Sequence, residues 1–387
     1  MTDTPLASGA TIGILGGGQL GRMLSVAAAR LGFRTHIFEP GANPPAGHVA
    51  DQVTTAAYED EAALRAFAAS VDVITYEFEN IPTTALDILE KLRPIRPNRR
   101  TLAVSQDRLT EKAFLSEQGL MTAPFAAVDD AIDLAEAIAE IGTPAILKTR
   151  RFGYDGKGQA RLKSADDAEQ ALADMAGAPA ILEGFVNFSH EVSVIGARGL
   201  DGSVSCFDPG ENVHRDGILH TTTVPARLSP AQRTDAVLLT AKILGALDYV
   251  GVMCVELFVT PAGLVVNEIA PRVHNSGHWT QNGCTIDQFE QHIRAVAGWP
   301  LGDGKRHSDV VMENLIGDDI DRIPEITKTD TAIHLYGKAE AKPGRKMGHI
   351  NRITGPAPVR QIAAPMRSQR SSGDFSTSPI QPNDAAI

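Results

Sequence analysis

The chain has 387 residues, 43% hydrophobic and 21% charged, which is typical of a folded globular protein of roughly two or three domains. Its net charge of −11 argues against nucleic acid as a partner, because such binding depends on lysine and arginine at the phosphates. The three widely spaced cysteines suit neither a disulfide framework nor a CxxC metal knuckle, which favours a reducing compartment. Neither a membrane-length apolar run nor a basic signal segment is present, so we expect a cytoplasmic protein without a membrane partner.

The N-terminal part of the chain alternates short apolar runs with helical patterns. Strands are predicted at residues 11–15, 35–38 and 71–77, and helices at 19–31 and 59–69. This alternation indicates a parallel sheet with helices on both faces, which is a Rossmann-like α/β arrangement. Prolines and an asparagine then interrupt the pattern, and we place the first domain at residues 1–102.

A glycine-rich turn follows the first predicted strand. Gly16, Gly18 and Gly21 have the GxGxxG spacing at the start of a helix, and Glu39 ends the next strand. This pattern is the fingerprint of a dinucleotide site, where backbone N–H groups at a helix N-terminus attract a pyrophosphate. The same glycines suit a tight turn that lets a helix pack closely, so a nicotinamide enzyme and a structural turn both remain open.

Two carboxylates end the strand predicted at 71–77. Strand alternation would place Glu77 and Glu79 on one face, at the carboxyl edge where open α/β sheets bind ligands. A solvated strand end would show the same residues.

The rest of the chain mixes strands and helices. Helices are predicted at 105–118, 166–175, 230–247 and 285–296, and strands at 145–149, 180–185, 191–196, 204–207, 251–259 and 264–269. Residues of about 120–186 form a compact α+β block, and 300–305 a linker. Strands at 333–336 and 348–353 would pair around Pro343-Gly344, and the Ser/Pro-rich residues 356–387 would remain unpacked.

A second glycine-rich loop carries positive charge. Lys148 ends a strand, and Gly153, Gly156 and Gly158 would let backbone amides approach an oxyanion, with Lys157 adding charge. The loop lacks the G-K-[ST] ending of a Walker A motif, and a flexible surface hairpin has the same composition.

The hairpin at 251–269 carries an acidic pair. With its turn centred on Ala262, residue 260 faces 264, residue 258 faces 266, and Glu256 faces Glu268. Facing glutamates repel each other, and a divalent cation such as Mg²⁺ or Mn²⁺, which prefers oxygen ligands, would remove the repulsion. Separate pairing of each glutamate with a lysine is the alternative.

Two donor-rich segments follow the hairpin. Residues 271–280 include Arg272, His274 and Asn275, which suit an anion that is being activated and do not have HExxH zinc spacing. A basic cluster surrounds Pro343-Gly344 and consists of Lys338, Lys342, Arg345 and Lys346. Such a cluster would suit a monophosphate, although a solvated basic turn has the same composition.

Together these motifs resemble a known family. Lys148, residues 153–159, 183–186, Glu191, Glu256 and Asn267-Glu268 resemble the nucleotide site of the ATP-grasp enzymes. The segments 14–24, 153–159, 271–280 and 343–346 are similar to the N5-carboxyaminoimidazole ribonucleotide synthetases, and the likeness covers residues 10–353. It implies a Rossmann-like domain that binds no dinucleotide, an ATP-grasp domain over 103–300 with a mobile lid, and a small β-rich C-terminal domain over 301–355. Beyond residue 355 the chain departs from the family pattern.

The resemblance implies an activity. Such enzymes are ligases of purine biosynthesis that use ATP and bicarbonate, through carboxyphosphate, to carboxylate 5-aminoimidazole ribonucleotide, and they release ADP and phosphate. The partners would be these small molecules, with Mg²⁺ and a second copy of the chain as a homodimer. Another ATP-grasp ligase, such as a formate-dependent glycinamide ribonucleotide transformylase, and a nucleotide sensor without catalysis remain as alternatives.

The resemblance also implies a role for each matching residue. The ATP site would comprise Arg108, Lys148, Gly153, Tyr154, Asp155, Gly156, Lys157, Gly158, Gln159, Glu183, Gly184, Phe185, Val186, Glu191, His214, Asn267 and Glu268. The metal ligands would be Glu256 and Glu268, and the bicarbonate or carboxyphosphate group would contact Arg272, His274 and Asn275. The ribonucleotide would contact Glu77, Tyr154, Asp155 and Lys157, with its 5′-phosphate at Lys338 and Arg345.

Overall fold

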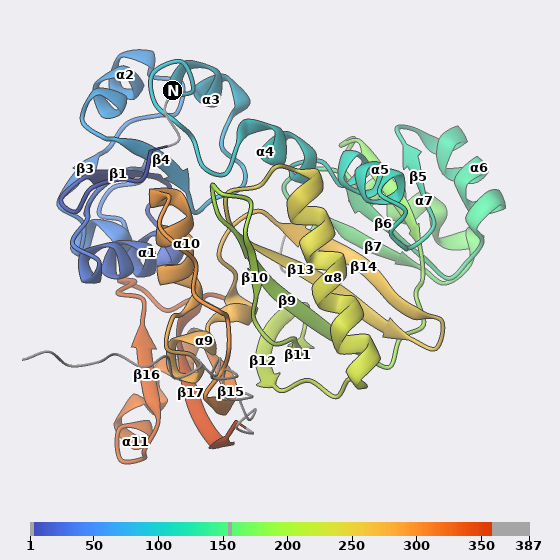
Figure 1. Ribbon diagram of the computed structural model, residues 1–387. Helices are drawn as coiled ribbons and strands as arrows, with labels where there is room; N and C mark the ends of the chain where they lie inside the picture. Colours follow the sequence, from blue (N-terminus) through green and yellow to red (C-terminus); the bar gives the residue numbers. More distant parts are fainter. Residues whose placement is uncertain (1–3, 154–156, 358–387) are drawn as a thin grey trace, which may run out of the picture. The chain divides into compact units, whose positions relative to one another are not determined.

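The N-terminal sheet is the parallel sheet that the alternation predicts (Figure 1). In this computed structural model, which describes residues 4–153 and 157–357, its strand order is β3-β2-β1-β4. Ile12 and Ile14 share a core with Leu24 of α1, whereas Leu15 packs with Phe67 of α2, so both faces are covered as expected. The elements are β1 (Thr11–Leu15), α1 (Gln19–Arg30), β2 (Arg34–Phe38), β3 (Gln52–Thr54), α2 (Glu61–Ala69), β4 (Val73–Tyr76), α3 (Thr83–Leu89) and α4 (Arg99–Ser105).

A small antiparallel sheet with the order β5-β8-β6-β7 follows, and it has its own hydrophobic core. Its strands and helices lie within the residues where the compact α+β block was expected. Asp130 caps α6 by accepting from the N–H groups of Ile132 and Asp133, so the helix begins at the next residue, Ala131. The elements are β5 (Phe125–Val128), α6 (Ala131–Ile141), β6 (Ala145–Thr149), β7 (Gln159–Leu162), α7 (Ala168–Asp174) and β8 (Ala180–Gly184).

The largest sheet has nine strands in the order β14-β13-β9-β11-β12-β15-β17-β16, with β10 also paired to β9. Its strands are β9 (His190–Arg198), β10 (Val204–Cys206), β11 (Gly210–Arg215), β12 (Ile218–Val224), β13 (Gly251–Thr260), β14 (Gly263–Ala270), β15 (Ser308–Ile316), β16 (Ala332–Leu335) and β17 (Lys346–Pro356). Its helices are α5 (Arg108–Glu117), α8 (Pro230–Ala246), α9 (Thr280–Gly283), α10 (Gln288–Ala297) and α11 (Ile323–Ile326). Figure 1 shows the long helix α8 lying along this sheet.

The C-terminal strands extend this large sheet, because β15 pairs with β12. The expected pairing of 333–336 with 348–353 is confirmed, with His334 opposite His349. Strand β17 runs to Pro356, which is the first residue of the expected tail, and residues 358–387 lie outside the described part of the chain. Among residues 4–153 and 157–357, none of the helices combines the length and hydrophobicity that crossing a bilayer requires.

The register of the acidic hairpin was predicted correctly at the glutamates and wrongly near the turn. The loop has two residues, so Thr260 faces Gly263 and Phe258 faces Val265, one residue away from the expected partners. A β-bulge next to Glu256 takes up the difference by leaving Asn267 unpaired in the ladder. Glu256 and Glu268 therefore face each other as predicted.

Candidate active site

The glycine-rich turn at the start of α1 is occupied by the protein's own carboxylates. Gly17 donates its N–H to Glu39 Oε2 at 2.8 Å, while Gly18 and Gly21 donate to Glu77 at 2.6 and 3.2 Å. These are the N–H groups that a dinucleotide pyrophosphate would need, so the geometry favours the structural turn. Burial raises the pKa of Glu77, although the two glycine N–H groups oppose this shift.

The expectation for the two carboxylates after β4 needs correction. The strand ends at Tyr76, so strand alternation does not orient either side chain. Glu77 turns back to the glycine turn, whereas Glu79 forms an ion pair of 2.9 Å with Arg272 Nε. The loop after β4 thus connects the first sheet to the donor-rich segment that follows the hairpin.

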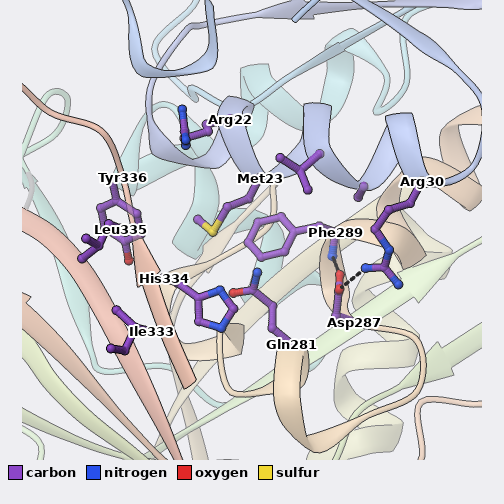
Figure 2. Close-up of a pocket in the computed structure, with 12 residues that line it drawn as sticks. Arg22, Met23, Arg30, Gln281, Asp287, Phe289, Ile333, His334, Leu335 and Tyr336 are labelled. Carbon is purple, nitrogen blue, oxygen red and sulfur yellow. Dashed lines mark hydrogen bonds and ion pairs between the residues drawn. The ribbon is translucent and has the colours of Figure 1, made fainter. Parts of the chain in front are cut away.

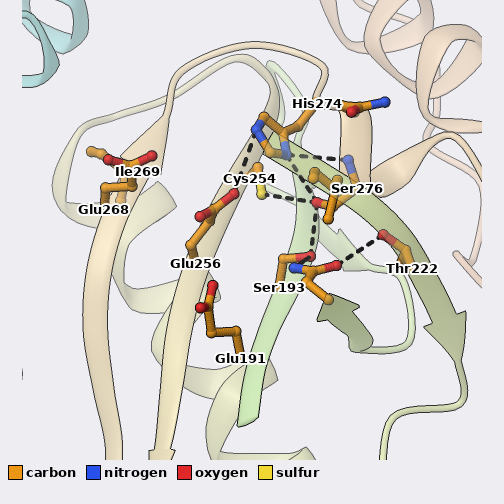
Figure 3. Close-up of polar contacts among 12 residues, drawn as sticks. Glu191, Ser193, Thr222, Cys254, Glu256, Glu268, Ile269, His274 and Ser276 are labelled. Carbon is orange, nitrogen blue, oxygen red and sulfur yellow. Dashed lines mark hydrogen bonds and ion pairs between the residues drawn. The ribbon is translucent and has the colours of Figure 1, made fainter. Parts of the chain in front are cut away.

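The facing glutamates of β13 and β14 have opposite electrostatic surroundings. Burial alone would raise the pKa of Glu268, but Arg108, at 2.9 Å, together with Lys148 and Lys112 holds it below its usual value. Burial and the nearby Glu268 charge raise the pKa of Glu256 to about 8. The nearby cations thus favour the ionised form of Glu268, whereas burial and the charge of Glu268 favour the protonated form of Glu256, and a cation between them would favour ionisation of both. Figure 3 shows the two side chains on neighbouring strands.

Two lysines meet the carboxylate of Glu183. Lys148 Nζ lies 2.9 Å from Glu183 Oε2 and Lys112 Nζ 3.5 Å from the same atom, and all three side chains are largely buried. The other oxygen of Glu183, Oε1, is buried and accepts no hydrogen bond from the described residues. Glu183 was expected at adenine, and this oxygen is the atom that could receive a ligand N–H group.

Helix α5 contributes site residues that the sequence motifs did not indicate. Lys112 donates to the backbone oxygen of Asn267 at 2.9 Å, and Glu111 accepts from the N–H of Ile269 at 2.9 Å. Burial and the Glu268 charge raise the pKa of Glu111 to about 8. Glu111 and Lys112 lie three and four residues after the predicted Arg108 on one face of the helix, and this spacing is the signal that could have identified them.

The second glycine-rich loop lies beside the same cations. Arg108 Nη2 donates to the backbone oxygen of Gly153 at 3.4 Å, Gly158 accepts from the N–H of Thr149 at 2.8 Å, and Gln159 pairs with Lys148. Lys157 belongs to the described part of the loop, whereas Tyr154, Asp155 and Gly156 lie outside the described residues.

The end of β8 and the start of β9 form another side of the site. Gly184 ends β8, Phe185 is 41% exposed beneath the guanidinium of Arg161, and Val186 is half-buried. Glu191 Oε2 lies 3.0 Å from His214 Nδ1 on the neighbouring strand β11. Burial would lower the pKa of His214, but Glu191, together with the charge of Glu256, holds it above its usual value.

The donor-rich segment brings its three predicted residues to the sheet. His274 Nε2 lies 3.5 Å from Glu256 Oε1, and burial, with Arg272 and Lys346 nearby, lowers the pKa of His274 well below its usual value. Asn275 exchanges two hydrogen bonds with Asn314 of β15, at 2.7 and 2.8 Å. Asn314 was not indicated by the sequence, because its strand is far away in the chain.

The basic cluster forms the turn between β16 and β17. Lys338 Nζ donates to the backbone oxygen of Lys346 at 2.7 Å, and Arg345 donates to that of Glu340 at 3.0 Å. The charge of Lys346 contributes to the lowered pKa of His274 and opposes the rise in the pKa of His214, so this turn lies within electrostatic reach of the site. A phosphate at Lys338 and Arg345 stays a prediction.

A separate cavity of about 250 Å³ lies between α1 and β16 (Figure 2). Arg22, Met23, His334 and Tyr336 are among its lining residues. Its lining includes none of the residues predicted for the site, so the candidate active site lies elsewhere.

The parallel domain, the small antiparallel block and the large sheet with its facing glutamates define an ATP-grasp enzyme. Sequence models agree with this class: the ribonucleotide synthetase preATP-grasp domain matches residues 9–106, the ATP-grasp domain 113–289, and the phosphoribosylaminoimidazole carboxylase C-terminal domain 310–357. The N5-carboxyaminoimidazole ribonucleotide synthase of Brucella melitensis is 56% identical over 91% of this chain and 99% of its own length. The chain belongs to the N5-carboxyaminoimidazole ribonucleotide synthase family.

Solved structures of this family are similar to most of this chain. An ADP complex of an N5-carboxyaminoimidazole ribonucleotide synthetase has a TM-score of 0.88 at 42% identity and covers 90% of this chain and 93% of its own. The Aspergillus clavatus enzyme in complex with ADP and 5-aminoimidazole ribonucleotide has a TM-score of 0.85 at 31% identity, covering 90% and 94%.

Proposed function

We propose that this chain catalyses the ATP- and bicarbonate-dependent carboxylation of 5-aminoimidazole ribonucleotide. The products are N5-carboxyaminoimidazole ribonucleotide, ADP and phosphate, in a ligase reaction of purine biosynthesis. The observation that supports it best is the pair Glu256–Glu268, with Arg108 paired to Glu268 and the charges of Lys112 and Lys148 close enough to lower the pKa of Glu268. Two anionic substrates, ATP and bicarbonate, need such a concentration of cationic donors before they can approach each other.

The acidic pair fits a magnesium ion, and Mn²⁺ could replace it. The ligands would be carboxylate oxygens of Glu256 and Glu268, which are hard donors on adjacent strands. Arg108 compensates the charge of Glu268. The raised pKa of Glu256 indicates that a negative charge on its carboxylate lacks such compensation, which a bound cation would provide. When bound, the ion would neutralise charge on the ATP phosphates.

The nucleotide would lie along the cationic side of the sheet. Arg108 and Lys148 would bind phosphate oxygens under the loop 153–159, with Asn267 beside them. The free oxygen of Glu183 would accept from the adenine amino group, next to the backbone of residues 184–186. Glu191 would accept from the ribose hydroxyls, with His214 holding its carboxylate in place.

The reacting groups would meet beside His274. Bicarbonate would attack the γ-phosphorus of ATP, and ADP would leave with carboxyphosphate as the new acyl phosphate. Arg272, His274 and Asn275 would donate to its oxygens, and the exocyclic amine of the ribonucleotide would then take the carboxyl group as phosphate leaves. The small α+β block, closing over the site, would exclude the water that hydrolyses carboxyphosphate.

The ribonucleotide would approach from the first domain and the C-terminal turn. Glu77, Tyr154, Asp155 and Lys157 would surround the aminoimidazole, and Lys338 and Arg345 would bind the 5′-phosphate. A homodimer and a cytoplasmic location remain predictions, and sedimentation of the full chain would test the first.

Measurement of ADP release tests the function directly. We expect turnover only when ATP, bicarbonate, Mg²⁺ and 5-aminoimidazole ribonucleotide are all present, with the carboxylated ribonucleotide formed in equal amount. Stimulation by formate with glycinamide ribonucleotide would instead identify the sister transformylase. ATP binding without any substrate-dependent ADP release would identify a nucleotide sensor and overturn the proposal.

A further inference from the structure

A line of buried polar side chains crosses the large sheet and ends at His274. Thr222 Oγ1 donates to Asn212 Oδ1 at 2.9 Å, and Asn212 Nδ2 donates to Ser193 Oγ at 3.0 Å. Ser193 then donates to Ser276 Oγ at 2.8 Å, and Ser276 Oγ lies 2.9 Å from His274 Nδ1. Figure 3 shows this connection from β12 to the loop that carries His274.

Strand order places three of the four side chains, and Ser276 lies in the short 3-10 turn Asn275–Gly277. Thr222 lies opposite Asn212 on neighbouring strands, and Ser193 lies opposite Glu256. All four are almost completely buried, with exposed fractions between 0% and 5%. Polar groups this deep need partners, and the three hydrogen bonds from Thr222 to Ser276 all donate toward the loop that carries His274.

The direction of donation determines where the proton of His274 resides. The backbone N–H of Ser276 also points at Nδ1, at 3.3 Å, and a backbone N–H can only donate. Nδ1 must therefore accept, and a neutral imidazole then carries its proton on Nε2. Nε2 is the atom that faces Glu256 Oε1 at 3.5 Å, on the side of the proposed reaction.

We propose that Thr222, Asn212, Ser193 and Ser276 form a positioning network that holds His274 as its Nε2–H tautomer. The imidazole then serves the carboxylation as a hydrogen-bond donor to a developing oxyanion, and not as a base. The catalytic part of this inference rests on the proposed function, whereas the tautomer itself does not.

The tautomer can be read by NMR on the full chain labelled with [¹⁵N]histidine. A long-range ¹H–¹⁵N correlation distinguishes protonated from unprotonated ring nitrogens, and His274→Gln assigns the signal by its loss. We expect an unprotonated Nδ1 and a protonated Nε2 for His274. A protonated Nδ1 would overturn the proposal. The expected tautomer in a chain that releases no ADP would overturn the proposed function alone.

Kinetics test whether the network acts on the reaction. Ser276→Ala should lower kcat about fivefold to tenfold, with KM for ATP within about twofold, since one hydrogen bond to the imidazole is lost. At the far end, Thr222→Val should lower kcat about twofold to threefold and shift the His274 ring signals, and Thr222→Ser should restore both. Thr240→Val is the matched control, because Thr240 is equally buried and its hydroxyl donates to Ala236 O within its own helix α8.

The two threonine variants separate positioning from simple stability. Both lose a buried hydroxyl, so both should unfold more easily, but only Thr222→Val should change kcat and the His274 signals. If Thr222→Val and Thr240→Val have the same kcat and leave the His274 signals unchanged, the network is structural and the proposal is wrong. This comparison holds even if Ser276→Ala does not fold.

Discussion

His292 of α10 connects the first sheet to the large sheet, and its environment predicts how the protein responds to acid. Its Nδ1 accepts from the N–H of Val252 at 3.0 Å, so Nε2 carries the proton and donates to Thr75 Oγ1 at 2.8 Å. The side chain is completely buried. A second proton on Nδ1 would face the Val252 N–H donor to donor, and burial lowers the pKa of His292 to about 3. Acidification must therefore destabilise this junction.

The sign and size follow from the two pKa values. The folded-state pKa lies below the unfolded value of about 6.5, so the unfolded chain binds more protons as the pH falls. The stabilisation is complete above about pH 6.5 and is lost progressively toward pH 3. For one such histidine, the free energy of unfolding falls by about 2 kcal/mol between pH 7 and pH 5.

Urea unfolding of the full chain at pH 7, 6 and 5 measures this loss. His292→Gln keeps a polar side chain and removes the titration, so its loss of stability between pH 7 and 5 should be about 2 kcal/mol smaller than that of the natural chain. His307→Gln, at an exposed histidine, serves as the control. The reasoning is refuted if His292→Gln loses as much stability as the natural chain over this range.

Three further predictions concern the site and the tail. Glu268→Gln should lower ADP release at least about 100-fold and weaken Mg²⁺-dependent ATP binding, because Arg108 would lose its charged partner and the proposed Mg²⁺ a ligand. Normal turnover at ordinary Mg²⁺ would exclude Glu268 as a metal ligand. Lys338→Ala should raise KM for the ribonucleotide about tenfold with little change in kcat. Lys342→Ala is the control and should leave both constants unchanged. An unaltered KM for Lys338→Ala would show that this lysine does not bind the 5′-phosphate. Deletion of residues 358–387 keeps the backbone hydrogen bond from Ala357 N to His307 O. The temperature of thermal unfolding and kcat should therefore stay the same, and insoluble protein would contradict this prediction.

Local patterns in the sequence were sufficient for many elements and for the acidic pair. Strands β1 and β6 have the predicted bounds, because each is a short apolar run that ends at a clear break. Strand alternation also predicted that Glu256 and Glu268 face each other. The turn was predicted one residue too long, and the bulge at Asn267 offsets that error, so the glutamates still face each other. Periodicity and turn chemistry are properties of neighbouring residues, and these features depend on little else.

Tertiary structure decided which partners each site residue has. Glu77 fills the glycine turn across 59 residues of chain, Lys112 reaches Asn267 across 155, and Asn314 meets Asn275 across 39. The polar strands β11 and β12 have weak alternation, so neither they nor the line of hydroxyls that leads to His274 was predicted. The order of strands in a sheet and the direction of a buried hydrogen bond depend on segments far apart in sequence, which local patterns do not encode. The sequence by itself thus determined the motifs and the family likeness, and only the fold determined where their charges and protons lie.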